Sequence, residues 1–185
     1  MIRVTSGKFR GRSVESPPRS KEIRPTTALM RESIFSRFQF QLPGSRFLDL
    51  FAGSGIMGLE ALSRGADFVL AIEADAEQCK IMRKNFNAIG INETQLKVSA
   101  NDVPRLLNSP CRKENFDFVF MDPPYGFHDL SQLVAHCIQN GWVKPNGVLI
   151  VEHGIRDEDL PGFTRKNYGD TSISTLCLTE EEDPH

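Results

Sequence analysis

The sequence predicts one α/β domain that is doubly wound around a mainly parallel β-sheet. Two observations carry this prediction. From residue 47 onward, short apolar runs alternate with segments of helical periodicity, as strand–helix units do. The 185 residues, 39% of them hydrophobic and 25% charged, suit a single globular domain. This composition excludes collagen-like, disordered and disulfide-scaffold chains, and no repeat period is visible.

The chain before this alternation consists of an extension and a helix. Residues 1–25 predict an irregular or hairpin-like basic extension, because glycines and prolines punctuate it. Thr26 or Thr27 then caps a helix that runs to about Phe38. We expect the main domain to span residues 26–179, followed by an acidic tail at residues 180–185.

Strands and helices follow in order. Five apolar runs predict strands at residues 47–50, 68–72, 95–99, 116–121 and 147–152. The intervening segments predict helices at residues 55–64, 75–89, 102–107 and 130–138. Residues 163–168 and 172–178 predict a closing antiparallel hairpin. Because ligands bind beyond the carboxyl ends of parallel strands, functional residues are expected after Leu50, Ile72, Ser99 and Met121.

Basic charge is concentrated at the amino terminus. Residues 1–46 hold ten Lys and Arg against three Asp and Glu, whereas the rest of the chain holds 12 against 21. A basic extension on an acidic body predicts a polyanionic partner. No apolar stretch approaches the ~18 residues of a membrane span, and no secretory signal is visible. Four separated cysteines indicate reduced thiols and a cytoplasmic protein, and the histidine spacing predicts no metal.

A glycine-rich turn, residues 53–58, follows the first strand of the alternation. Glycines allow a tight turn and let a ligand approach the amino end of the next helix. The pattern alone is a weak signal, but its place between a strand and a helix strengthens it. Glu73 ends the second strand, where it could accept the ribose hydroxyls of an adenine nucleoside or be a solvated strand end.

Asp49 lies just before this turn. A carboxylate there would repel a pyrophosphate and attract a cation such as a sulfonium, which favours S-adenosylmethionine over a nicotinamide dinucleotide. The alternative is a strand-end carboxylate that bonds the amides of the loop.

The fourth strand ends in Asp122-Pro123-Pro124-Tyr125. The exocyclic amine of a nucleobase is a poor nucleophile, because its lone pair is delocalised into the ring. The Asp122 carboxylate and the Pro123 carbonyl are two acceptors that can hold such an amine, and the prolines stiffen the backbone. Tyr125 offers a face on which the base can stack, worth ~1–3 kcal/mol. The motif predicts methyl transfer to a nucleobase amine, with a purely structural turn as the alternative.

Motifs along nearly the whole chain resemble the RsmD family of bacterial ribosomal RNA methyltransferases. They lie at residues 6–12, 24–27, 31–32, 49–66, 73, 122–125, 151–153 and 168–169. Ser6 and Ala28-Leu29 depart from the family's usual glycine and charged pair. The resemblance implies a Rossmann-like methyltransferase fold, S-adenosylmethionine as cofactor, and methylation of a guanine at N2 in 16S ribosomal RNA.

The resemblance also implies roles for individual residues. The implied cofactor contacts are Asp49, Phe51, Gly53, Gly55, Glu73, Asn101, Asp102 and Asp122. The implied catalytic residues, which hold the guanine, are Asp122, Pro123 and Tyr125. The implied RNA contacts are Lys8, Arg10, Arg12, Arg24 and Arg31. We expect a monomer that acts on RNA within a small-subunit assembly intermediate.

Three alternatives stay open at this point. The same four-residue motif could serve another planar amine, such as adenine N6 in DNA. A nicotinamide-dependent oxidoreductase is disfavoured by Asp49 and by the Pro-Pro motif. A non-catalytic RNA-binding assembly factor is disfavoured by the intact motif.

Overall fold

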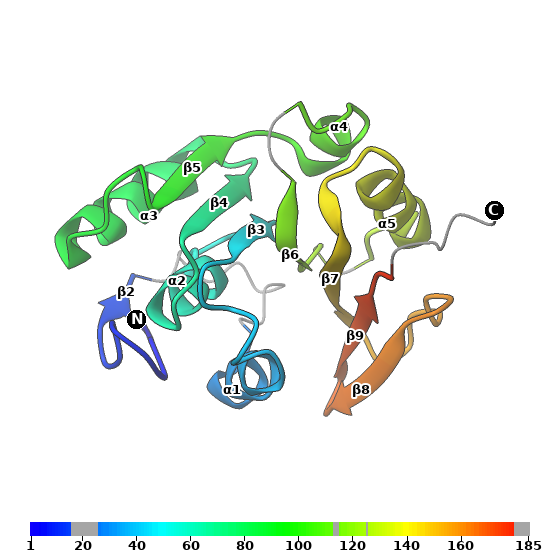
Figure 1. Cartoon of the computed structure of the whole chain (residues 1–185), viewed down its shortest axis with the longest axis horizontal. Helices are drawn as coiled ribbons and strands as arrows, with labels where there is room; N and C mark the ends of the chain where they lie inside the picture. Colours follow the sequence, from blue (N-terminus) through cyan, green and yellow to red (C-terminus); the bar gives the residue numbers. More distant parts are fainter. Residues whose placement is uncertain (16–25, 113–114, 125, 180–185) are drawn as a thin grey trace.

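The computed structural model describes residues 1–15, 26–112, 115–124 and 126–179, and in these ranges a seven-stranded sheet forms the centre of the domain (Figure 1). The strand order is β5-β4-β3-β6-β7-β9-β8. The first five strands in this order are mutually parallel, and β9 pairs antiparallel with both β7 and β8. The strands are β3 (Arg46–Leu50), β4 (Phe68–Glu73), β5 (Leu96–Ala100), β6 (Phe116–Met121), β7 (Val143–Gly154), β8 (Thr164–Tyr168) and β9 (Thr171–Cys177).

Helices cover both faces of the sheet, which makes three layers. The helices are α1 (Ala28–Arg37), α2 (Ile56–Ser63), α3 (Ala76–Ile89), α4 (Val103–Leu107) and α5 (Leu130–Gln139). On one face, α1, α2 and α3 pack against alternate strand residues such as Phe47 and Phe118. On the other face, α4 and α5 pack against the intervening residues such as Leu48 and Val119. Both faces of the central strands are therefore buried, which explains why these strands read as continuous apolar runs.

The helix boundaries follow local signals in the sequence. The Thr27 side chain accepts a hydrogen bond from Met30 N at the start of α1. Asp75 accepts from two backbone N–H groups at the start of α3, and Gly90 ends that helix in the left-handed conformation. Asp102 caps α4 through Arg105 N. Each cap satisfies N–H groups that a helix end leaves free, so these predicted ends are confirmed.

Strand β7 is longer than predicted. The sequence predicted residues 147–152, whereas the strand runs over Val143–Gly154. Its pairing with β6 shifts register between Val143 and Val148, and Asn146 has a φ of 65°. The Pro145-Asn146-Gly147 segment has the composition of a turn, but here it forms an irregularity within one strand.

The amino-terminal segment forms a hairpin that is fixed to the domain. β1 (Ile2–Arg3) pairs antiparallel with β2 (Ser13–Val14), and Val14 is fully buried. Lys8 N donates to the Ser63 carbonyl at 2.7 Å. Gly7 has a φ of 80°, and a Cβ built on it would lie 1.8 Å from that same carbonyl oxygen. Residues 1–15 thus pack on the end of α2, and only a glycine permits this close approach.

Within the described part of the chain, no helix is both long enough and apolar enough to cross a membrane. The same residues include no cluster of three or more His, Cys, Asp or Glu that could hold a metal ion.

Candidate active site

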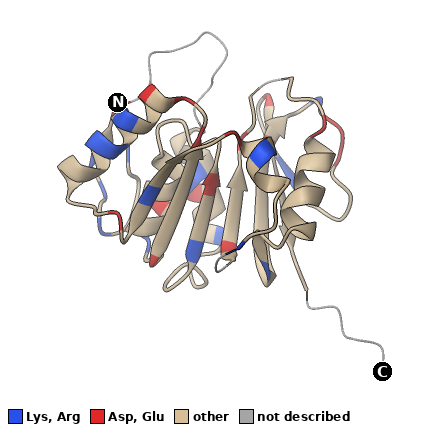
Figure 2. Cartoon of the chain, turned by 90° about the horizontal axis from the view of Figure 1, so that it is seen from above, with Lys and Arg blue, Asp and Glu red and all other residues tan. Residues whose placement is uncertain are grey.

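The carboxyl ends of the parallel strands meet at one edge of the sheet. Leu50 at the end of β3 lies beside Ile72 of β4 and Met121 of β6, and Met121 lies beside Val151 of β7. Four acidic residues lie at or near the carboxyl ends of these strands and of the neighbouring β5: Glu73, Asp102, Asp122 and Glu152. Figure 2 shows acidic residues in several of the loops at this edge. The structure therefore brings the two predicted motifs, the glycine turn and the Asp-Pro-Pro segment, to neighbouring strand ends.

The glycine turn is held in a conformation that other residues rarely adopt. Phe51, Gly53 and Gly55 have φ values of 60°, 53° and 74°. A Cβ on Gly55 would lie 2.5 Å from the ring of Phe86 in α3, so a side chain there would force the turn away from the helix. Gly55 is therefore required both by its backbone conformation and by packing.

Glu73 links the turn to the second strand. Its Oε2 accepts from Gly53 N and its Oε1 accepts from Asp75 N, each at 2.9 Å. The side chain is only partly buried. Because a carboxylate has about four lone-pair sites, these two bonds leave acceptor capacity toward the edge of the sheet. That capacity and the backbone turn beside it fit the ribose of an adenine nucleoside.

Asp49 lies beneath the turn. It is 1% exposed, and its Oδ2 accepts from Gly58 N at 2.9 Å. Burial raises its pKa to about 7, opposed by the Gly58 hydrogen bond and assisted by the charge of Glu73. This geometry matches the alternative interpretation, a strand-end carboxylate that bonds the loop backbone. Asp49 can act on a bound cation only through its charge.

Asn101 and Asp102 lie at the end of β5, and both are exposed. Asn101 Nδ2 donates to Ser99 Oγ at 2.6 Å, and Asp102 Oδ1 accepts from Arg105 N at 2.9 Å. Each side chain therefore has a structural partner. Asn101 N donates to the Glu73 carbonyl, so the end of β5 lies beside the end of β4.

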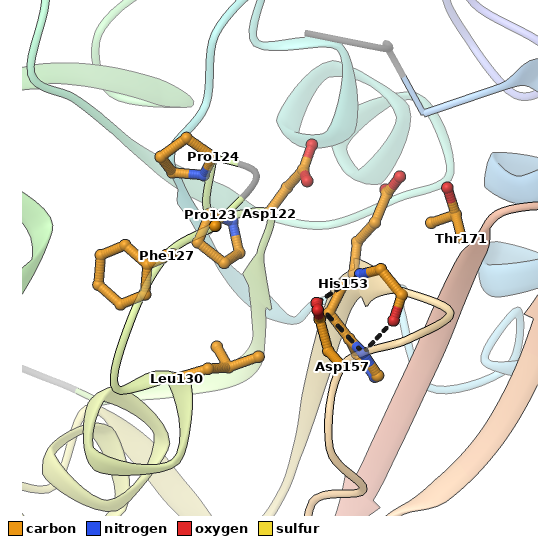
Figure 3. Close-up of a pocket in the computed structure, with 11 residues that line it drawn as sticks. Asp122, Pro123, Pro124, Phe127, Leu130, His153, Asp157 and Thr171 are labelled. Atoms are coloured by element: carbon orange, nitrogen blue, oxygen red, sulfur yellow. Dashed lines mark hydrogen bonds and ion pairs between the residues drawn. The ribbon is translucent and has the colours of Figure 1, made fainter. Parts of the chain in front are cut away.

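A pocket opens where β6 and β7 end (Figure 3). Pro124, Phe127 and Leu130 lie on one side of it and His153, Asp157 and Thr171 on the other, with Asp122 between them. The remaining lining residues are Pro123, Gly126, Glu152 and Gly154. Phe127 N donates to the Pro124 carbonyl at 3.0 Å, which closes the turn after the motif. Among the described residues, neither the Asp122 carboxylate nor the Pro123 carbonyl has a hydrogen-bond partner.

The electrostatics of the pocket are dominated by carboxylates. Burial raises the pKa of Asp122 well above its ordinary value, and the charges of Glu152 and Asp49 add to this effect. Burial also raises the pKa of Glu152, while the hydrogen bond from Thr26 lowers it. A ligand that brings hydrogen-bond donors would relieve this crowding of negative charge.

An aromatic contact joins the two motifs. The rings of Phe51, two residues before the glycine turn, and Phe127, after the Asp-Pro-Pro segment, meet edge to face with centroids 5.9 Å apart. The pocket therefore lies directly beside the glycine turn, so that ligands of the two motifs would be neighbours.

The structure exposes some of the predicted RNA contacts and buries another. Lys8, Arg10 and Arg12 are exposed on the amino-terminal hairpin. Arg31 is 2% exposed, and its guanidinium donates to the carbonyls of Thr26 and Arg3 and pairs with buried Glu60. A side chain in this position cannot reach RNA, so the prediction for Arg31 is wrong. Packing of α1 on α2 buries a residue that the sequence shows only as one more basic residue.

Two predicted residues, Tyr125 and Arg24, lie outside the described residues. The sequence assigned no site role to several residues of the pocket, above all Glu152 and His153 on β7, which belong to the family motif at residues 151–153, and Phe127 in the loop after the Asp-Pro-Pro segment. The signal for Glu152 was present, since it is an acidic residue in an otherwise apolar strand. Its proximity to Asp122 depends on the pairing of β6 with β7, which the sequence does not specify.

The family model described as conserved hypothetical protein 95 matches residues 2–176. Ribosomal RNA small subunit methyltransferase D of Haemophilus influenzae is 33% identical over 167 residues, which is 90% of this chain and 84% of that protein. The chain belongs to this family, RsmD.

Two other proteins are similar to the chain over nearly their full length. A putative rRNA methyltransferase of Bacillus subtilis, YlbH, is 33% identical, with 94% of this chain and 97% of that protein aligned. The solved structure of the putative methyltransferase yhhF from Escherichia coli superposes with a TM-score of 0.84 at 27% identity, covering 97% of this chain and 99% of that one. The predicted family and the Rossmann-like methyltransferase fold are thus confirmed.

Proposed function

We propose that this protein methylates the exocyclic N2 of a guanine in 16S ribosomal RNA, with S-adenosylmethionine as the methyl donor. Membership of the RsmD family supports a methyltransferase that acts on small-subunit ribosomal RNA. The observation that carries the chemistry is a pair of acceptors, the Asp122 carboxylate and the Pro123 carbonyl, to which no described residue donates a hydrogen bond, in a pocket beside the glycine turn.

The glycine turn and Glu73 would bind the methyl donor. Backbone N–H groups of the turn and the remaining lone pairs of Glu73 suit the amino-acid and ribose parts of S-adenosylmethionine. Asn101 and Asp102 lie at the neighbouring strand end, where an adenine base would project. When bound, S-adenosylmethionine supplies an electrophilic methyl group on a sulfonium. Asp49, buried beneath the turn, would favour that sulfonium through its ionised form.

Asp122 and Pro123 would orient the amine. Two acceptors on its two hydrogens fix its position and favour positive charge on nitrogen as it attacks the methyl carbon. The nitrogen must then release one proton, and the Asp122 carboxylate that would hold the amine is placed to accept it. Its raised pKa suits it to accept that proton. Holding the two reactants side by side contributes most of the rate.

The exposed side chains of Lys8, Arg10 and Arg12 would hold the RNA backbone. Because the hairpin is docked on α2, these cations have a fixed position relative to the pocket. We infer that the protein acts as a monomer on a small-subunit assembly intermediate, in which the target base can leave its stack.

The test is transfer of labelled methyl to extracted 16S RNA and to partially assembled small subunits. After digestion, the labelled nucleoside is identified. N2-methylguanosine is the expected product. Labelled N6-methyladenosine, or no label in RNA from either substrate, would refute the proposal.

The variant Asp122→Ala isolates the role of the motif. We expect it to bind S-adenosylmethionine in calorimetry with an affinity close to that of the wild type, while methyl transfer falls by about two to four orders of magnitude. Near-normal turnover would remove Asp122 from its assigned role. The matched control is Asp117→Ala, which removes a carboxylate from the amino-terminal part of the same strand.

A further inference from the structure

We propose that Glu152 accepts the N1–H of the target guanine and so selects guanine over adenine. This inference rests on the proposed guanine-N2 methylation. It assigns a role to a buried carboxylate in the pocket and answers a question that the Asp-Pro-Pro-Tyr motif leaves open, namely which base amine is methylated.

The position of Glu152 follows from strand pairing. Strands β6 and β7 are parallel, with Met121 opposite Val151, so Asp122 and Glu152 occupy adjacent positions one residue further along. Both side chains line the pocket. The charge of Glu152 also acts on Asp122, as expected for neighbouring carboxylates.

One oxygen of Glu152 is committed and the other is available. Oε2 accepts the hydroxyl of Thr26 at 2.6 Å. Within the described part of the chain, Oε1 accepts no hydrogen bond. Because Glu152 lines the pocket, a molecule bound there can supply a hydrogen-bond donor to Oε1.

A buried chain of contacts fixes this carboxylate. Thr26, which holds Oε2, is 5% exposed, and its own carbonyl accepts from Arg31 Nη1 at 2.7 Å. Arg31 is in turn paired with Glu60, whose side chain is fully buried. Thr26 and Arg31 belong to the motifs at residues 24–27 and 31–32, and the structure connects both to the pocket. A side chain held this firmly can discriminate between ligands by the direction of one hydrogen bond.

The chemistry of the purine edge matches this arrangement. In guanine, N1–H and the N2 amine are adjacent donors. If Asp122 and Pro123 hold the amine, a neighbouring carboxylate is placed to accept N1–H. In adenine, and in any purine that lacks a proton at this position, N1 is an acceptor whose lone pair a carboxylate repels. A charged hydrogen bond to a base edge is worth about 10- to 100-fold in discrimination.

The test uses 2-aminopurine, which keeps the 2-amino group but has an unprotonated N1. The RNA that accepts methyl in the transfer assay is rebuilt by ligation with either guanosine or 2-aminopurine at the modified position. Single-turnover rates are measured for the wild type and for Glu152→Gln. The amide has nearly the shape of the carboxylate but can present a donor to N1.

We expect the wild type to act on 2-aminopurine about 10- to 100-fold more slowly than on guanine. Glu152→Gln should act more slowly on guanine and reduce the ratio of the two rates toward one. The matched control Asp157→Asn, an acid-to-amide change at another lining residue of the same pocket, should keep the wild-type ratio.

The outcomes separate the two proposals. If the wild type methylates guanine and Glu152→Gln keeps the wild-type ratio, the role of Glu152 is overturned while the proposed function stands. If the wild type does not methylate guanine, both are overturned. If thermal unfolding shows that Glu152→Gln is not folded, Thr26→Val is used instead. This variant keeps the Glu152 carboxylate but removes the hydrogen bond that orients it. It should also lower the ratio, and an unchanged ratio would count against the proposal.

Discussion

The buried guanidinium of Arg31 gives a quantitative prediction about stability. In Arg31→Met the side chain keeps much of its length but loses every donor. The Thr26 and Arg3 carbonyls, which accept from Arg31 at 2.7 and 2.9 Å, would lose this partner. The Glu60 carboxylate would keep Thr5 N at 2.7 Å and Arg64 Nε at 3.4 Å.

The magnitude follows from these contacts. Removing one partner of a buried ion pair costs about 3–5 kcal/mol. Because Arg64 still compensates Glu60, we expect the lower end of that range, about 3 kcal/mol. This is a large fraction of the free energy of unfolding of a typical domain, which is about 5–15 kcal/mol.

The assay is urea unfolding of Arg31→Met beside Arg37→Met. Arg37 is exposed on the same helix and lies over the ring of Phe38, so its replacement should cost less than about 1 kcal/mol. The midpoint should fall for Arg31→Met with little change in the slope. If both variants lose the same stability, the structural role assigned to Arg31 is wrong. At temperatures where Arg31→Met is folded, the salt dependence of its RNA binding should match that of the wild type.

Three other predictions concern the hairpin and the pocket. Replacing Arg10 and Arg12 with Ala should weaken RNA binding and lower the salt slope by about 2, because two phosphate contacts are lost; an unchanged slope would exclude that role. Because the pKa of Asp122 is raised and the ionised form accepts the amine, kcat/KM should fall as the pH drops through a value well above an ordinary carboxyl, and a pH–rate profile that is flat in this range contradicts the assignment. Gly7→Ala should loosen the hairpin and destabilise the protein by more than ~2 kcal/mol, against about 1 kcal/mol for Gly11→Ala, which has a φ of 84° but no atom within 4 Å of its Cβ; equal losses in thermal unfolding would show that the hairpin is not docked.

Local structure was predictable because its causes are local. The caps at Thr27, Asp75 and Asp102 are side chains that accept hydrogen bonds from backbone groups within three residues. The helix starts can therefore be predicted from the sequence. The strands of residues 68–73 and 116–121 were likewise evident from apolar runs of the right length. The start of β7 was not evident from the sequence, because Pro145 and Gly147 are residues typical of a turn. Tertiary pairing keeps this segment within the strand.

The candidate site was predictable only in part. Gly55 and Asp122 stand in motifs with recognisable spacing at strand ends, so the edge of the sheet where they lie could be inferred. Whether a given charged side chain is buried or exposed could not be inferred from the sequence. Arg12 and Arg31 are the same residue type in a basic part of the sequence. Arg12 is exposed on the hairpin, whereas Arg31 is buried where α1 packs on α2.

The sequence by itself determined the strand–helix order and the chemistry of the Asp-Pro-Pro-Tyr segment, since both depend on residues close together in the chain. The tertiary structure alone decided that Glu152 stands beside Asp122, that one of its oxygens accepts no hydrogen bond from the described residues, and that Thr26 and Arg31 hold it there. Those contacts join residues separated by up to 126 positions, and their geometry arises from sheet pairing and helix packing rather than from any local pattern.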